Sequence, residues 1–190
     1  MKFAIGYALA LIPLSFVIPF EWSFENGFIE NFQVVILIGS GIFSLYLRSQ
    51  SSDSEIRAFN LWCALIFFLL AARELSYGGV FFLDFEDENG RHYVPNSRQP
   101  WYRELHIAIG IYIAMLAAML KRLPIRKMLS IRIPIQIVGL LIVGISFATI
   151  GDHEYLFDFK QSQILEETSE CLMYGMLPML CRYYDRALKI

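Results

Sequence analysis

Residues 58–83 read AFNLWCALIFFLLAARELSYGGVFFL, and Arg73 and Glu74 are the only charged residues in this run of 26. A helix of about 20 apolar residues is long enough to cross the hydrocarbon core of a bilayer. The run lacks the alternation of a β-strand, and an open sheet would leave backbone groups unpaired in lipid. It therefore predicts a membrane-spanning helix that carries two charges roughly 22 Å from its start.

Further apolar runs of similar length lie on both sides of this segment. They predict a single integral membrane domain over residues 1–190, an all-α polytopic helix bundle with about six transmembrane helices. The composition agrees, because 56% of the residues are hydrophobic and 18% are charged, against about 25% charged in an average soluble domain. The first run has a second interpretation as a signal peptide, but it is long for one and no small-residue cleavage site follows it. We expect spans at residues 3–20, 28–47, 58–83, 105–120, 133–150 and 164–181.

The basic residues set the expected orientation. Six crossings place both termini on one side of the membrane, and lysine and arginine gather on the cytoplasmic side. Of the 18 acidic residues, 15 lie on or near the opposite side, which the rule for basic residues does not explain. Eleven of the 16 basic residues mark the predicted cytoplasmic side, together with both termini: Lys2, Arg48, Arg57, Lys121, Arg122, Arg126, Lys127, Arg132, Arg182, Arg186 and Lys189.

Net charge and cysteine spacing exclude two other classes of protein. The net charge of −2 and the lack of an arginine-rich arm argue against a nucleic-acid partner. Cys63, Cys171 and Cys181 lie in apolar runs without C-x-x-C spacing. We therefore interpret them as small buried hydrophobic residues rather than as a redox pair or a zinc site.

Several polar residues lie inside the apolar runs, close to the predicted outer side. A charged side chain in hydrocarbon costs at least about 2.5–3.5 kcal/mol, so such residues usually face a protein interior or a wet cavity. Acidic residues at a helix start, or an Arg–Glu ion pair that locks two helices, are structural alternatives. We predict one polar cluster that opens outward. Its members include Glu30, Gln33, Arg73, Glu74, Glu166, Glu167 and Glu170.

Two histidines and an aspartate border the same side. His106 begins one expected span, and Asp152 and His153 end another. Imidazole and carboxylate are the ligands that zinc, iron or manganese take, which predicts a divalent metal such as Zn held by His106, Asp152, His153 and Glu170. The alternative for each histidine is a structural hydrogen bond at a helix end.

Three short strings carry a family resemblance: RELSYG at 73–78, ENFQ at 30–33 and LEETSE at 165–170. The chain resembles a family of uncharacterised small polytopic inner-membrane proteins of bacteria. This resemblance implies a multi-pass protein of the bacterial inner membrane. With the orientation that the basic residues predict, the polar cluster then faces the periplasm. The chain is also distantly similar to alkaline-ceramidase-like membrane hydrolases, whose scattered His, Asp, Glu and Ser residues hold a catalytic zinc, although it lacks their paired H-x-x-x-H on a late helix.

Two functional hypotheses follow from this cluster. The first is a metal-dependent hydrolase or transferase that acts on a lipid-linked substrate from the outer leaflet. In it, Glu74 or Glu167 serves as general base and Arg73 holds an anionic headgroup. The second is a non-enzymatic small transporter or membrane assembly partner, in which the buried charges fix helix packing or carry protons. Membrane lipids are partners in both.

Overall fold

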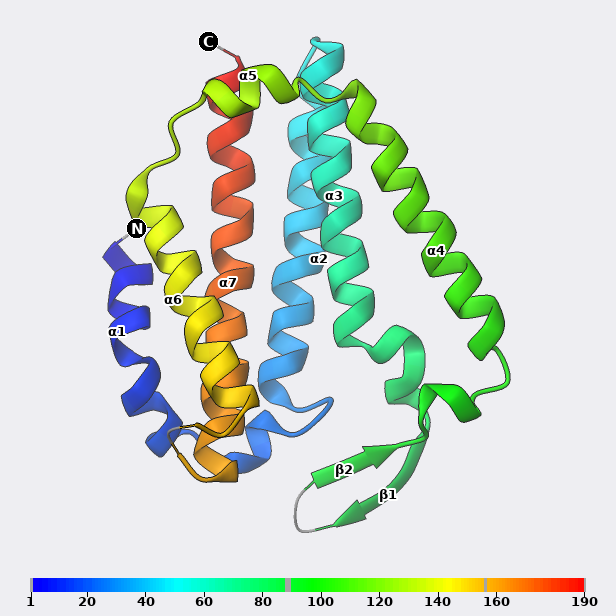
Figure 1. The fold of residues 1–190 in the computed structure, drawn as a ribbon, viewed down its shortest axis with the longest axis vertical. Helices are drawn as coiled ribbons and strands as arrows, with labels where there is room; N and C mark the ends of the chain where they lie inside the picture. The colour runs from blue at the N-terminus through cyan, green and yellow to red at the C-terminus, as the bar shows by residue number, and fades with distance from the viewer. Residues whose placement is uncertain (1, 88–89, 156, 190) are drawn as a thin grey trace.

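The computed structural model describes residues 2–87, 90–155 and 157–189, which form a helix bundle with one small β-hairpin (Figure 1). The sequence therefore predicted the all-α class correctly. The α-helices are α1 (Lys2–Val17), α2 (Phe28–Ser49), α3 (Ser54–Glu74), α4 (Tyr102–Met119), α5 (Ile125–Ser130), α6 (Ile135–Asp152) and α7 (Phe159–Leu188). Short 3₁₀ helices lie at Phe20–Ser23, Ser76–Phe81, Asn96–Arg98 and Leu120–Arg122, and the antiparallel hairpin consists of β1 (Leu83–Asp87) and β2 (Gly90–Tyr93).

Helix α7 is the centre of the bundle. It packs against α1 and α6 on one side and against α2 and α3 on the other (Figure 1). One apolar cluster joins α2, α3 and α7 through buried residues such as Leu37, Phe67 and Tyr174. A second joins α1, α6 and α7 through residues such as Leu11 and Leu140. Both cores therefore depend on α7.

Apolar helices and apolar exposed surface identify a membrane protein. Four segments within the described residues are long and apolar enough to cross a bilayer: α2, α3, Tyr102–Arg122 and α6; a shorter apolar helix covers Ala4–Val17. Large hydrophobic side chains face outward on these helices, including Val35, Ile111 and Ile142, which are 66%, 66% and 57% exposed. Soluble monomers rarely present continuous apolar surface of this kind, whereas a lipid environment favours it.

The third predicted span ends earlier than expected. Helix α3 stops at Glu74, whereas the apolar run continues to residue 83. The reason is a turn with left-handed backbone at Ser76, Tyr77 and Gly78, with φ of 45°, 51° and 95°. A helix cannot continue through such residues. Arg73 and Glu74 therefore lie in the last turn of α3 rather than inside a longer span.

Helix α4 is joined to α3 along only part of its length. The indole N–H of Trp62 donates to the Leu116 carbonyl at 3.1 Å, and the Tyr112 hydroxyl donates to the Leu65 carbonyl at 2.8 Å. Towards its N-terminus, α4 diverges from α3 (Figure 1). Residues at that end of α4 are consequently separated from the rest of the bundle.

Helices α6 and α7 approach each other closely at two glycines. A Cβ on Gly144 would lie 2.6 Å from Met173 Cγ, and one on Gly151 would lie 2.6 Å from the Ser162 carbonyl oxygen and 2.7 Å from the Glu166 nitrogen. No real Cβ makes backbone contacts this short, so Gly151 allows a contact that any other residue would force apart. This contact fixes the first turns of α7.

Candidate functional site

A cavity of about 380 Å³ lies at the end of the bundle where α2 begins and α3 ends. The first turns of α7 complete it, and the β-hairpin lies at the same end (Figure 1). We call this cavity the acidic pocket. Its lining consists of Glu25, Glu30, Arg73, Glu74, Ser76, Tyr77, Glu166, Glu167 and Glu170.

Arg73 and Tyr174 form the centre of a hydrogen-bond network between α3 and α7. The Tyr174 hydroxyl donates to Glu74 Oε1 at 2.7 Å and accepts from Arg73 Nη1 at 3.1 Å. The same guanidinium lies 3.5 Å from Glu74 Oε1 and 3.7 Å from Glu170 Oε1. Glu74 is 7% exposed and Glu170 15%, whereas the Arg73 side chain is 55% exposed. Arg73 is therefore already occupied by two carboxylates.

A second polar contact joins α2 to α7. Gln33 is fully buried, and its amide N–H groups donate to the Glu167 carboxylate and to the Glu167 backbone carbonyl, both at 2.9 Å. The amide oxygen of Gln33 has no hydrogen-bond partner among the described residues. On the first turn of α2, Glu30 accepts a hydrogen bond from the Asn26 backbone N–H. The positive end of the helix dipole also favours a carboxylate at this position.

Carboxyl groups dominate the acidic pocket, because six of them surround one guanidinium. Glu25 lies before α2, where the Ser76 hydroxyl donates to its carboxylate at 3.4 Å. Burial raises the pKa of the Glu25 carboxyl above its ordinary value, and Ser76 and the nearby His92 oppose this rise. Crowded carboxylates of this kind favour the uptake of a proton or of a cationic group.

Four of the predicted site residues come together in this pocket. Arg73, Glu74, Glu167 and Glu170 all line it, as the clustering of polar residues at one membrane side predicted. They come from α3 and α7, which are separated in sequence by about half of the chain but packed together in the bundle. Glu30 joins them from α2.

The predicted metal ligands are not assembled. His106 projects from the end of α4 that diverges from α3, is exposed, and has its Nδ1 2.7 Å from the Tyr102 carbonyl oxygen. His153 has its Nδ1 3.1 Å from the Thr149 carbonyl oxygen and 3.2 Å from Asp152 Oδ2. Neither His106 nor His153 lines the acidic pocket, and neither does Asp152.

Within the part of the chain that the structure describes, no group of three or more His, Cys, Asp or Glu side chains is arranged to hold a metal ion. The prediction that His106, Asp152, His153 and Glu170 form one ligand set is therefore corrected. All four lie towards the same end of the bundle, but α4 leans outward and the α6 residues occupy the exposed end of their helix. Only Glu170 faces the pocket.

Other polar and sulfur contacts were missed at the level of sequence. At the opposite end of the bundle, the buried Asn60 donates to Asp185 Oδ1 at 2.7 Å, and Lys189 pairs with Asp185 Oδ2 at 2.7 Å. Cys63 and Cys181 are free thiols with Sγ atoms 3.1 Å apart between α3 and α7. An asparagine in an apolar run was the available signal for the first contact. The second has no local signal, because the two cysteines are far apart in the chain.

Comparison of the chain with protein-family models, curated proteins and solved structures found no match.

Proposed function

We propose that the chain crosses the membrane six times, with both termini in the cytoplasm and the acidic pocket on the periplasmic side of a bacterial inner membrane. Four long apolar helices support this topology, and α1 and α7 run beside them (Figure 1). Helix α7 has 30 residues, about 45 Å at 1.5 Å per residue, which exceeds the hydrocarbon thickness. The excess of basic residues at the other end of the bundle supports the orientation.

For the function, we propose that the acidic pocket binds the ammonium-bearing group of a small or lipid-linked substrate and acts on it by acid–base chemistry, as a hydrolase or transferase. The observation that carries this proposal is the lining of the pocket, in which six carboxyl groups share about 380 Å³ with one arginine. An ammonium group supplies positive charge and three hydrogen-bond donors. It therefore complements the acceptors that the pocket offers.

The hydrogen bonds divide these carboxylates into two kinds. Glu74 and Glu167 accept hydrogen bonds from Tyr174 and Gln33, which fix their position. Glu170 lies 3.7 Å from the guanidinium of Arg73, and its carboxyl group also faces Glu74 and Glu166. Its oxygen atoms are thus the better placed to accept a proton from a bound substrate, so we assign the proton transfer to Glu170 rather than to Glu74 or Glu167.

The sign of the substrate charge also differs from the first expectation. Arg73 was expected to hold an anionic headgroup, but its guanidinium already faces Glu74, Glu170 and the Tyr174 hydroxyl. An added anion would meet the surrounding glutamates as well. Electrostatic complementarity therefore favours a cationic group.

Binding measurements with defined amines test this proposal. The wild-type protein in lipid nanodiscs is titrated with ethanolamine and with spermidine, and nanodiscs with and without phosphatidylethanolamine test a lipid-linked amine. Glu170→Gln removes one charge from the pocket, and Glu104→Gln is the matched control on the first turn of α4, outside the pocket. A zinc titration is included for the metal hypothesis.

The expected result is saturable amine binding that Glu170→Gln weakens by about tenfold, the usual effect of losing one charge-assisted contact, and that Glu104→Gln leaves unchanged. Binding that is equal in wild type and Glu170→Gln contradicts the proposal. So does the absence of binding for every amine.

A non-enzymatic role is the second candidate, and the interhelical bonds of Tyr174 and Gln33 favour it. These bonds join α7 to α3 and to α2, as a structural role for buried charges requires. Such a role predicts that Glu170→Gln changes only the stability of the protein, with no ligand-dependent difference from Glu104→Gln.

A further inference from the structure

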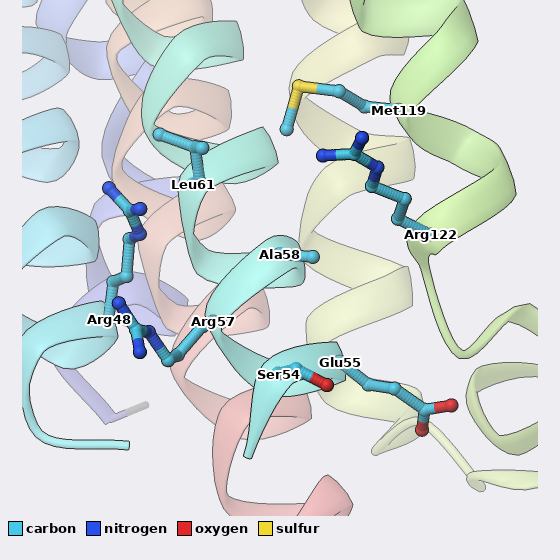
Figure 2. Close-up of a pocket in the computed structure, with 8 residues that line it drawn as sticks. All are labelled: Arg48, Ser54, Glu55, Arg57, Ala58, Leu61, Met119 and Arg122. Atoms are coloured by element: carbon cyan, nitrogen blue, oxygen red, sulfur yellow. The ribbon is translucent and has the colours of Figure 1, made fainter. Parts of the chain in front are cut away.

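A second cavity, of about 370 Å³, lies at the end of the bundle opposite to the acidic pocket. It is formed where α2 ends, α3 begins and the chain leaves α4. Three arginines line it: Arg48, Arg57 and Arg122. In Figure 2, Arg48 and Arg57 lie on one side of α3, and Arg122 extends towards α3 from the other side, from the segment after α4. We call this cavity the basic pocket.

The positive charge of the basic pocket is not neutralised by the described part of the chain. None of the three arginines forms an ion pair with any residue that the structure describes. The single acidic residue of the lining is Glu55, and Lys127 Nζ pairs with its carboxylate at 2.7 Å. Neighbouring Asp53 caps α3 by accepting from the backbone N–H groups of residues 55 and 56.

Guanidinium groups that line one pocket without a counter-ion repel one another, and a bound anion reduces this cost. Their planar donor arrangement matches the oxygen atoms of a phosphate group, which they bind in a bidentate manner. The serine at the start of α3, Ser54, adds a hydroxyl to the same lining. The polar part of the pocket therefore has the chemistry of a phosphate site.

The rest of the lining is apolar. Ala58 and Leu61 contribute from α3, and Met119 contributes from the end of α4 (Figure 2). A free phosphate ion has no apolar group that could be buried against these side chains. The glycerol backbone and the upper acyl chain of a phospholipid do, and burial against an apolar surface is favourable. The pocket also lies at the ends of three of the four helices that are apolar enough to cross a membrane, namely α2, α3 and the segment Tyr102–Arg122.

We propose that the basic pocket binds the phosphate group of an anionic phospholipid, with Arg48, Arg57 and Arg122 as its ligands. Basic pockets between transmembrane helices on the cytoplasmic side are suited to anionic headgroups. The site does not depend on the proposed function of the acidic pocket, because the two cavities share no residue. It would give the protein a preference for membranes rich in anionic lipid and hold α3 and α4 together at this end.

Native mass spectrometry of the full chain in detergent tests this proposal. The protein is titrated with phosphatidylglycerol, which is anionic, and with phosphatidylcholine, which has the same phosphate but no net charge. Arg48→Gln, Arg57→Gln and Arg122→Gln each remove one ligand. Arg126→Gln is the matched control, because Arg126 is exposed on α5 at the same side and lies outside the pocket.

We expect wild type to bind phosphatidylglycerol more tightly than phosphatidylcholine. Each pocket variant should bind phosphatidylglycerol about tenfold more weakly, and Arg126→Gln should bind it as wild type does. Arg57→Lys keeps the charge but loses the fork of donors, so an intermediate affinity is expected. Equal binding of both lipids, or equal loss in Arg126→Gln and Arg57→Gln, overturns the proposal.

A parallel arm distinguishes a lipid from a soluble anion. Inorganic phosphate is added to delipidated protein, and the shift in the thermal unfolding midpoint is compared with that caused by phosphatidylglycerol. The proposal predicts a clear shift with the lipid and little with inorganic phosphate. An equal, arginine-dependent shift with inorganic phosphate would show a soluble ligand and overturn the assignment to a phospholipid.

Discussion

Replacing Tyr174 by phenylalanine removes one hydroxyl from the network that joins α3 to α7. This hydroxyl donates to Glu74 Oε1 at 2.7 Å and accepts from Arg73 Nη1 at 3.1 Å. Tyr174 is 4% exposed and Glu74 is 7% exposed, so water cannot easily replace the lost donor. Arg73 is half exposed and can bind water instead. The bond to Glu74 therefore dominates the effect.

The size of the effect follows from that bond. A hydrogen bond to a charged group contributes about 1.5–3 kcal/mol net, so Tyr174→Phe should lower the free energy of unfolding by about 2 kcal/mol. In a chain of this length, a loss of 1 kcal/mol lowers the thermal unfolding midpoint by about 2–4 °C. We therefore expect the midpoint of Tyr174→Phe to be lower by about 4–8 °C. Phenylalanine keeps the apolar contacts of the ring, so little packing energy is lost.

Thermal unfolding of the purified protein in detergent, followed by circular dichroism, measures this change. Tyr46→Phe is the matched control, because Tyr46 is 57% exposed on α2. This variant should unfold at the same midpoint as wild type. A double-mutant cycle with Glu74→Gln isolates the contact, since the two changes should be clearly non-additive if the groups are bonded. Equal midpoints for Tyr174→Phe and Tyr46→Phe, or additive effects in the cycle, would refute the network.

Three further substitutions or treatments have defined outcomes. Glu25→Gln should stabilise the protein at pH 8, because burial raises the pKa of Glu25 and the charged carboxylate therefore disfavours the folded state. Unfolding curves should show that this advantage over wild type disappears as the pH falls below about 4, where Glu25 is protonated in both the folded and the unfolded protein. Gly151→Ala should destabilise by about 1–3 kcal/mol because its Cβ meets the backbone of α7, whereas Gly139→Ala, with open space around it, should not. Mild oxidation with copper phenanthroline and oxygen should form a disulfide between Cys63 and Cys181, which peptide mass mapping detects. If both thiols stay reduced, the packing of α3 on α7 is contradicted.

The sequence predicted the helices well where an apolar run and a helix have the same limits. The expected spans at 28–47, 105–120 and 133–150 differ from α2, α4 and α6 by only a few residues at either end. The predicted end of the third span, at residue 83, was wrong, because hydropathy does not detect the left-handed turn at residues 76–78. Phe81 and the two residues after it are apolar, but they lead into the hairpin.

The sequence also predicted one part of the candidate site correctly and another part wrongly. Chain order in an antiparallel bundle indicates which end of the bundle a residue occupies, and this placed Arg73, Glu74, Glu167 and Glu170 together correctly. Chain order does not indicate which helices are lateral neighbours. His106 was therefore assigned to the cluster, although α4 diverges from α3 at that end (Figure 1).

Accessibility of residue 170 tests most directly whether carboxylates from separate helices share one outward-facing, water-accessible pocket. Glu170→Cys is introduced with the native cysteines replaced by alanine, and intact cells are treated with a membrane-impermeant thiosulfonate. Ser54→Cys, in the basic pocket at the opposite end, is the matched control. We expect labelling of residue 170 from outside, and labelling of residue 54 only after the cells are opened. If residue 170 stays unlabelled in both cases, or reacts only in opened cells, then these carboxylates do not share an outward-facing, water-accessible pocket.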